Sequence, residues 1–253
     1  MQLRDRLMQG EPLAGTFLKT PEHLLVEVLA ASGLDFICLD AEHSPFDRGR
    51  MDACLAMARA LDFPALVRVP AGRPEIILGV LDSGATGIVV PHVDSVAKAE
   101  EVARAARFGH GGRGFAGTTR WAGVLGAPMA DLLERSRKET IVMAQIEEPE
   151  GVDAANDIAA VDGIDALFIG PADLSVAYGK TNVDSPELHA AYKTVGEACK
   201  THGKGFVTWA PDVAKMKDWH PYGVNCFFIA SELGWVLSGA RTVVADIKAL
   251  SPD

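Results

Sequence analysis

Eight short apolar runs, separated by helix-like segments, constrain the fold more than any other feature of this sequence. Each run has the length of a strand buried on both faces, and between the runs apolar residues recur three and four positions apart. Strict alternation of strand and helix implies right-handed crossovers and a parallel sheet. The expected strands are residues 15–18, 36–40, 65–69, 87–91, 141–146, 166–170, 205–209 and 226–230.

The chain length favours closure of that sheet. It has 253 residues, close to the roughly 250 typical of one (β/α)8 barrel. We therefore expect residues 1–253 to form a single (β/α)8 TIM barrel domain that ends in a helix over residues 231–250. A Gly-rich segment, 109–129, interrupts the alternation and contains a GxGxxG match. Because it follows a helix pattern, it is a poor dinucleotide fingerprint, and we expect it to lie over the top of the barrel and wall the site.

Composition excludes several classes of function. The formal net charge of −10 argues against a nucleic-acid surface and gives no attraction to an anionic membrane. The first ten residues lack the apolar core of a signal peptide, and no uncharged apolar stretch approaches the ~18 residues of a membrane span. The cysteines (Cys38, Cys54, Cys199 and Cys226) are widely spaced in or beside apolar runs, as expected of reduced, buried thiols. We expect a cytoplasmic protein.

Polar residues gather where the expected strands end, and in such a barrel the chemistry sits at the carboxyl ends of the strands. Two consecutive apolar strands are each followed by a carboxylate, Glu147 and Asp173, which predicts a shared divalent cation. Oxygen donors suit Mg²⁺, Mn²⁺ or Co²⁺. The alternative is that both are acids favoured by helix dipoles. The complete set of polar strand-end residues is Lys19, Asp40, Glu42, His43, Arg68, His92, Gln145, Glu147 and Asp173.

Three of these residues have an interpretation of their own. His43 follows a buried strand and is a candidate general acid/base. Arg68 lies inside an apolar strand, where its charge is costly unless it is paired, and a ligand oxyanion would offset that cost. Lys19 is the candidate nucleophile for the alternative, Schiff-base chemistry, although the apolar strands offer no buried lysine.

Four motifs together resemble one known family. They are Leu39-Asp-Ala-Glu-His-Ser-Pro45, Val67-Arg-Val-Pro70, Gln145-Ile-Glu147 and Phe168-Ile-Gly-Pro-Ala-Asp-Leu-Ser175. In order and spacing they are similar to those of the HpcH/HpaI family of metal-dependent pyruvate aldolases, especially its 4-hydroxy-2-oxoheptanedioate and 2-oxo-3-deoxy sugar acid aldolases. The resemblance covers nearly the whole chain.

The resemblance implies roles for named residues. Glu147 and Asp173 would ligate the metal, and Arg68 would stabilise negative charge on the keto oxygen. His43, through a water molecule, would exchange a proton with the 4-hydroxyl, and Asp40 would orient it. The pyruvate unit would be held by Gln145, Pro171, Ala172 and Asp173.

The resemblance is less complete elsewhere. Phe17 stands where the family often has Trp, and Trp209 is expected on the aldehyde side of the site. Asp82 matches a family position that raises the basicity of the histidine, yet it precedes its strand and so lies at the wrong end of its own barrel. It would have to reach the site of a neighbouring subunit. The family suggests a homohexamer in which the final helix packs on a partner.

The implied activity is that of a carbon–carbon lyase. It would reversibly cleave 4-hydroxy-2-oxo acids to pyruvate or hydroxypyruvate and an aldehyde, with a divalent metal as cofactor, as in the catabolism of aromatic compounds. The alternatives are a CoA-ester lyase or phosphoenolpyruvate-utilising enzyme of the same fold, which would need cations for a phosphate. Another is a non-catalytic oligomeric barrel, which predicts a disrupted set of acid/base residues.

Overall fold

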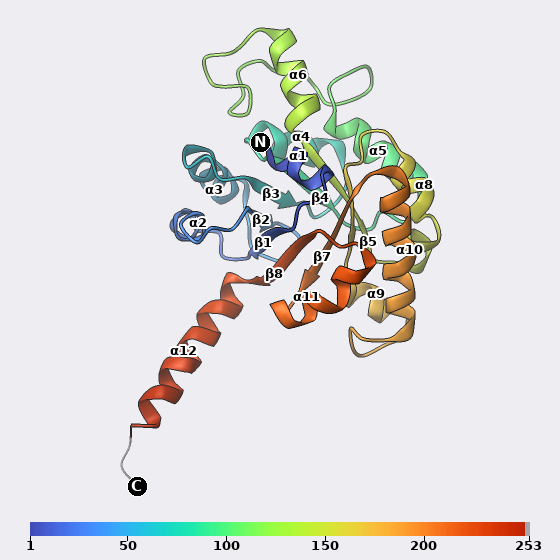
Figure 1. The fold of residues 1–253 in the computed structure, drawn as a ribbon. Coiled ribbons are helices and arrows are strands. Elements are labelled where there is room, and N and C mark those ends of the chain that lie inside the picture. Colours follow the sequence, from blue (N-terminus) through green and yellow to red (C-terminus); the bar gives the residue numbers. More distant parts are fainter. Residues whose placement is uncertain (251–253) are drawn as a thin grey trace.

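A computed structural model describes residues 1–250 and shows a closed barrel of eight parallel strands in sequential order, as the sequence predicts (Figure 1). Every strand overlaps an expected one, and two coincide with their predictions to the residue. The strands are β1 (Leu13–Leu18), β2 (Phe36–Asp40), β3 (Ala65–Arg68), β4 (Gly87–Val90), β5 (Ile141–Ile146), β6 (Ala166–Ile169), β7 (Gly205–Ala210) and β8 (Cys226–Ser231).

Helices follow the strands and cover the outside of the barrel. Those that lie between strands are α2 (His23–Ala30), α3 (Arg48–Ala60), α4 (Pro74–Asp82), α5 (Val96–Ala106), α6 (Met129–Glu139), α7 (Pro149–Asp153), α8 (Ala155–Ala160), α9 (Pro171–Ala177), α10 (Pro186–His202) and α11 (Val213–Trp219), with the short 3₁₀ helix η1 (His220–Tyr222). The helices at the two ends of the chain are α1 (Leu3–Met8) and α12 (Glu232–Lys248). None of the helices within residues 1–250 is long and apolar enough to cross a membrane.

The inside of the barrel is packed with side chains, as expected for eight strands. Phe228 is its centre: its ring centroid lies 4.9 Å from that of Phe36 and 5.0 Å from those of Phe17 and Phe168. Leu3 and Leu7 of α1 belong to the same cluster and close the amino-terminal end. A second cluster, between strands and helices, forms the outer core.

The barrel closes tightly between β4 and β5. A Cβ atom on Gly87 would lie 2.3 Å from the carbonyl oxygen of Ile141, so the two strands can pair at this point only if residue 87 has no side chain. The glycine therefore belongs to the strand for a packing reason, not to a turn.

The segment between α5 and α6 lies at the opposite end of the barrel from the one expected. The backbone N–H of its Trp121 donates to the backbone carbonyl of Asp82, and the Trp121 carbonyl accepts from the Arg59 side chain. Asp82 and Arg59 both lie at the carboxyl-terminal ends of their helices. Figure 1 shows α6 and this loop on the side of α1 and the N-terminus. The prediction that it walls the site was wrong, because a segment that follows a barrel helix begins at the amino-terminal end.

The last helix, α12, extends away from the barrel at the other end (Figure 1). It matches the predicted helix closely, but it buries few of its own apolar residues within the chain. The exposed ones are Leu233, Trp235, Val236, Leu237, Val243, Val244 and Ile247. An apolar helix face of this length left open on one chain is typical of a surface that another molecule covers.

Candidate active site at the carboxyl ends of the strands

A cavity of about 450 Å³ opens at the carboxyl-terminal end of the barrel. It brings together most of the residues predicted for the site, from strands far apart in the sequence. Those on its wall are Phe17, Lys19, His43, Arg68, Gln145, Pro171, Ala172, Asp173 and Trp209. A larger hollow, of about 1020 Å³, lies between α5 and α8 where β6 begins, and contains none of these residues.

Asp40 and Arg68 form the buried ion pair of the site. The two residues are register partners on β2 and β3, and the Asp40 carboxylate is fully buried. Its Oδ1 accepts from the Arg68 Nε at 3.0 Å and lies 2.8 Å from Nη2. Burial raises the pKa of Asp40, but the bonds from Arg68 outweigh it and leave the pKa below its usual value. Both groups are therefore charged.

Three neighbours hold this pair in place. The backbone N–H of His43 also donates to Asp40 Oδ1, at 3.2 Å, so Asp40 orients the histidine's backbone and not its ring. The Phe17 ring lies under the guanidinium of Arg68, with 4.4 Å between ring centroid and Cζ. The Lys19 ammonium lies 3.5 Å from Asp40 Oδ2, which has no hydrogen-bond partner. Lys19 is thus an ion-pair partner at the pocket wall and is not deeply buried.

Glu147 follows β5 and is 3% exposed. Its Oε1 accepts from the backbone N–H of His92 at 2.8 Å, and its Oε2 accepts from the side-chain amide of Gln145. The other amide atom, Gln145 Oε1, is buried without a hydrogen-bond partner. Burial raises the pKa of Glu147. Among the described residues no lysine or arginine contacts this carboxylate to oppose that shift.

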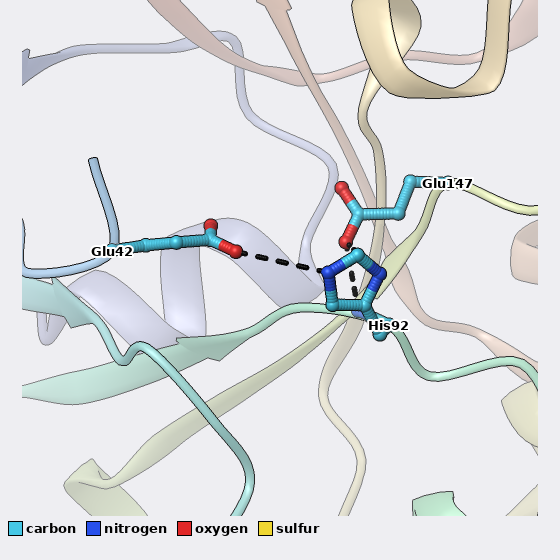
Figure 2. Close-up of side chains that lie close together, drawn as sticks. All are labelled: Glu42, His92 and Glu147. Atoms are coloured by element: carbon cyan, nitrogen blue, oxygen red, sulfur yellow. Dashed lines mark hydrogen bonds and ion pairs between the residues drawn. The ribbon is translucent and has the colours of Figure 1, made fainter. Parts of the chain in front are cut away.

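The structure groups Glu147 with two residues to which the sequence assigned no role. Ligand atoms of Glu42, His92 and Glu147 all lie within 4.8 Å of one another (Figure 2). Asp173, the predicted second metal ligand, is not part of this three-residue group. It lies in the first turn of α9, exposed on the cavity wall, and its charge is close enough to contribute to the raised pKa of Glu147.

This donor chemistry fits a divalent cation. Two carboxylates and an imidazole converge, and Gln145 Oε1 and Glu42 Oε2 are buried with no hydrogen-bond partner. Burial also raises the pKa of Glu42, even though Arg68 lies 3.3 Å away. A cation bound here would supply positive charge to Glu147, which has no lysine or arginine within ion-pair distance among the described residues.

Other residues have positions or contacts that the sequence analysis did not predict. Asp82 ends α4 and pairs with Arg113, outside the cavity, so a role for it through a neighbouring subunit stays a prediction. Buried Glu232 accepts from the backbone N–H groups of Lys19 and Thr20, and sequence reasoning missed it. Its only signal was an acid in the first turn of the last helix. Ser231 and Gly234 also line the cavity unforeseen.

The comparisons with known proteins agree with this geometry. The family model HpcH/HpaI aldolase/citrate lyase matches residues 13–226. A hydroxypyruvate/pyruvate aldolase of Paraburkholderia phytofirmans is 31% identical over 98% of this chain and 97% of its own length. A 5-keto-4-deoxy-D-glucarate aldolase of an Enterobacter strain is 33% identical over 88% of this chain and 87% of its own.

Solved structures with the same fold are also similar in sequence to this chain. An HpcH/HpaI aldolase/citrate lyase family protein from Burkholderia cenocepacia superposes with a TM-score of 0.90 at 30% identity, covering 97% of this chain and 98% of that one. The citrate synthase SbnG matches with a TM-score of 0.87 at 30% identity, over 98% of each chain. The chain belongs to the HpcH/HpaI aldolase/citrate lyase family. It is a carbon–carbon lyase with a pyruvate aldolase function, as its sequence predicts.

The buried ion pair leads to a prediction about stability. Replacing Arg68 by Met removes both hydrogen bonds from the guanidinium and leaves the buried Asp40 charge with only Lys19, 3.5 Å away, as a cationic partner, so we expect the free energy of unfolding to fall by about 3 kcal/mol. Arg50→Met is the matched control. Arg50 is exposed and lies 3.8 Å from an equally exposed Asp47, so its loss should cost less than about 1 kcal/mol. Urea unfolding measures both, and equal losses would contradict the prediction.

Proposed function

We propose that this chain catalyses the divalent-metal-dependent, reversible cleavage of 4-hydroxy-2-oxo acids to pyruvate or hydroxypyruvate and an aldehyde. The observation that carries the proposal is the single cavity in which His43, Arg68, Gln145 and Asp173 meet, with Glu147 directly behind Gln145. The names of the relatives, hydroxypyruvate/pyruvate aldolase and 5-keto-4-deoxy-D-glucarate aldolase, support this donor chemistry.

Glu147 and Asp173 hold the cation in this proposal, which is Mg²⁺, Mn²⁺ or Co²⁺. When bound, the cation acts as a Lewis acid on the 2-oxo group of the donor. Gln145 and the backbone of Pro171, Ala172 and Asp173 bind the donor carboxylate, because these groups line one side of the cavity. The free Gln145 Oε1 is available to a hydroxyl of the substrate, such as that of hydroxypyruvate.

Arg68 stabilises the negative charge that develops on the keto oxygen. It is preorganised for this role, since Asp40 and Phe17 fix its guanidinium before substrate binds. His43, exposed at the cavity, takes the proton of the 4-hydroxyl through a water molecule during cleavage and returns it to the aldehyde oxygen in the synthetic direction. Trp209 and Phe17 form the aldehyde side, where Trp209 is fixed by its bond to the Ala230 carbonyl.

The cavity does not favour the alternative enzymes of this fold. Among the described residues, Lys19 and Arg68 are the lysine and arginine on its wall, and both already face Asp40. The described part of the cavity wall therefore offers no further cationic side chain to bind a phosphate or a coenzyme A nucleotide. The complete set of acid/base residues likewise argues against a non-catalytic barrel.

We also propose that residues 1–253 form one aldolase domain of a cytoplasmic homohexamer, with α12 on a neighbouring copy. The exposed apolar face of α12 supports assembly, and the buried free thiols (Cys38, Cys54, Cys199 and Cys226) support a reducing compartment.

Assembly gives a first test. We expect sedimentation velocity to show a species of about six copies. Val236→Asp, which places a charge on the apolar face of α12, should shift that species to smaller ones. A wild-type chain that sediments as a monomer at micromolar concentration would contradict the assembly without touching the aldolase reaction.

Metal removal tests the reaction itself. Pyruvate release from a racemic 4-hydroxy-2-oxo acid should stop after EDTA treatment and return with Mg²⁺, Mn²⁺ or Co²⁺. Glu147→Gln should abolish the cation-restored rate, whereas Glu150→Gln, an exposed acid in the next helix, should leave it unchanged. Release that survives chelation would exclude the metal mechanism and direct attention to borohydride trapping at Lys19.

Proton transfer by His43 predicts a kinetic effect. His43→Ala should slow aldol cleavage by about 10²-fold or more, the range of a general acid/base contribution. His202→Ala is the control, because this half-buried histidine bonds Asn156 and does not line the cavity. Steady-state kinetics with saturating cation compares the two, and near-wild-type cleavage by the His43 variant would remove it from the mechanism.

A further inference from the structure

Lys19 is a cationic residue of the cavity to which the metal-dependent reaction assigns no role. It is the first residue after β1 and lines the cavity, and its side chain is 34% exposed. In a closed barrel of eight strands in sequential order, β1 lies opposite β5, the strand that carries Gln145. Lys19 therefore stands across the cavity from a group that holds the donor carboxylate.

The order of strands around the rim gives the direction of a bound substrate. The donor groups Gln145 and Asp173 belong to the ends of β5 and β6, whereas His43, which exchanges a proton with the 4-hydroxyl, follows β2. The strand β2 pairs with β1. A 4-hydroxy-2-oxo acid that places its donor end at β5 and β6 and its 4-hydroxyl beside His43 thus directs the rest of its chain toward β1.

The Lys19 ammonium has hydrogen-bond donors available for a ligand. Within the described chain, the acid at ion-pair distance is Asp40, whose Oδ2 lies 3.5 Å away. This distance is longer than a normal N–H···O bond, and Oδ2 has no hydrogen-bond partner. The guanidinium of Arg68 already contacts the other oxygen of Asp40. Because an ammonium carries several N–H donors, Lys19 can keep its contact with Asp40 and bind a second acceptor.

Buried Glu232 fixes the backbone that carries this ammonium. Its Oε1 accepts from the backbone N–H of Lys19 at 3.0 Å and from that of Thr20 at 2.7 Å, and its Oε2 lies 3.0 Å from the same Lys19 nitrogen. Glu232 is 3% exposed, so these bonds are shielded from water. Its neighbours Ser231 and Gly234 line the cavity with Lys19. A lysine on an anchored backbone has less conformational freedom to lose when it binds a ligand.

We propose that Lys19 is a specificity-determining residue whose ammonium binds a carboxylate on the acceptor aldehyde, and that Glu232 is its positioning residue. The proposal rests on the proposed function, because the aldehyde is the second product of that cleavage. The preferred substrates are then 4-hydroxy-2-oxo diacids, which carry a second carboxylate at the end far from the 2-oxo group. One ammonium shared with Asp40 suits a single carboxylate and not the several charges of a phosphate.

The alternative is that Lys19 only balances the charge of Asp40. Its loss would then act through Arg68 and His43, which Asp40 holds in place, and would affect every aldehyde alike. The two interpretations differ in the preference between an acidic aldehyde and a neutral one of the same shape. That preference is a ratio of kcat/KM values and does not depend on the absolute rate.

The experiment measures aldol addition of pyruvate by the full chain, with saturating Mg²⁺, Mn²⁺ or Co²⁺, to two isosteric pairs of aldehydes. They are glyoxylate with 2-methylpropanal and 4-oxobutanoate with 4-methylpentanal, in which an isopropyl group replaces the carboxylate. In at least one pair, Lys19→Met should lower the ratio of kcat/KM for the acid to that for the neutral aldehyde by about 10-fold or more. This is the usual effect of losing a hydrogen bond between charged groups.

Lys180→Met is the matched control. Lys180 is also 34% exposed, pairs with Glu187 and does not line the cavity, so its loss should leave both ratios unchanged. Each aldehyde has its own intrinsic reactivity, so the change of the ratio on mutation, and not the ratio itself, carries the test.

Three further variants separate charge from position. Lys19→Arg keeps a cation at the wall and should retain more of the preference than Lys19→Met. Glu232→Ala releases the backbone of Lys19 and should lower the preference. Glu232→Gln should lower it less, because its amide oxygen still accepts from that backbone. Circular dichroism and the melting temperature establish that each variant is folded, and an equal loss for both aldehydes of each pair in Glu232→Ala would reject the positioning role.

The outcomes separate this proposal from the proposed function. Addition of these aldehydes with a preference that Lys19→Met leaves unchanged in both pairs would overturn the role of Lys19 and leave the aldolase reaction standing. A loss of preference in Lys180→Met as large as that in Lys19→Met would also overturn it. No cation-dependent addition of any of the aldehydes would reject the proposed function, and this proposal with it.

Discussion

The buried ion pair between Asp40 and Arg68 is the interaction on which the rest of the site depends. Parallel pairing of β2 and β3 makes the two residues direct neighbours at the carboxyl-terminal edge, so the barrel itself sets their distance. A charge of either sign alone would be too costly at this depth, and each keeps the other ionised. The pair then organises its surroundings: Phe17 lies under the guanidinium, Lys19 approaches from the wall, and the His43 backbone bonds the carboxylate.

On the other side of the rim the electrostatics are reversed. Burial raises the pKa of both Glu42 and Glu147, and at Glu42 it outweighs the opposing effect of Arg68, which lies 3.3 Å away. An ionised carboxylate at this depth costs free energy unless positive charge or hydrogen bonds offset it. Function and stability are opposed at this point: the site keeps buried acids in order to bind a ligand, and the ion pair between Asp40 and Arg68 holds the adjoining strands in place.

The two ends of the barrel differ in their roles: one stabilises the fold and the other binds ligand. At the amino-terminal end, α1 inserts Leu3 and Leu7 under the barrel core, and the Trp121 ring of the loop before α6 contacts the guanidinium groups of Arg113 and Arg135. That end is closed and built for stability. At the carboxyl-terminal end the strands open into the cavity. There α12 extends away from the barrel (Figure 1), and its apolar residues are exposed. The buried Glu232 joins the start of α12 to the end of β1, so the helix and the pocket wall are mechanically connected.

The sequence by itself determined the barrel and the residues at its functional end. Apolar runs with helical intervals specify parallel strands because each strand must be buried on both faces, and the first polar residue after each run must then lie at the rim. Glu147, Asp173 and His43 were expected at the rim because each follows an apolar run, and Arg68 was singled out as a charge inside such a run. The tertiary structure alone decided which of them meet. That Nδ1 of His92 bonds Glu148, and that the loop before α6 lies at the far end, depend on neighbouring strands and on the direction of helices, neither of which has a local sequence signal.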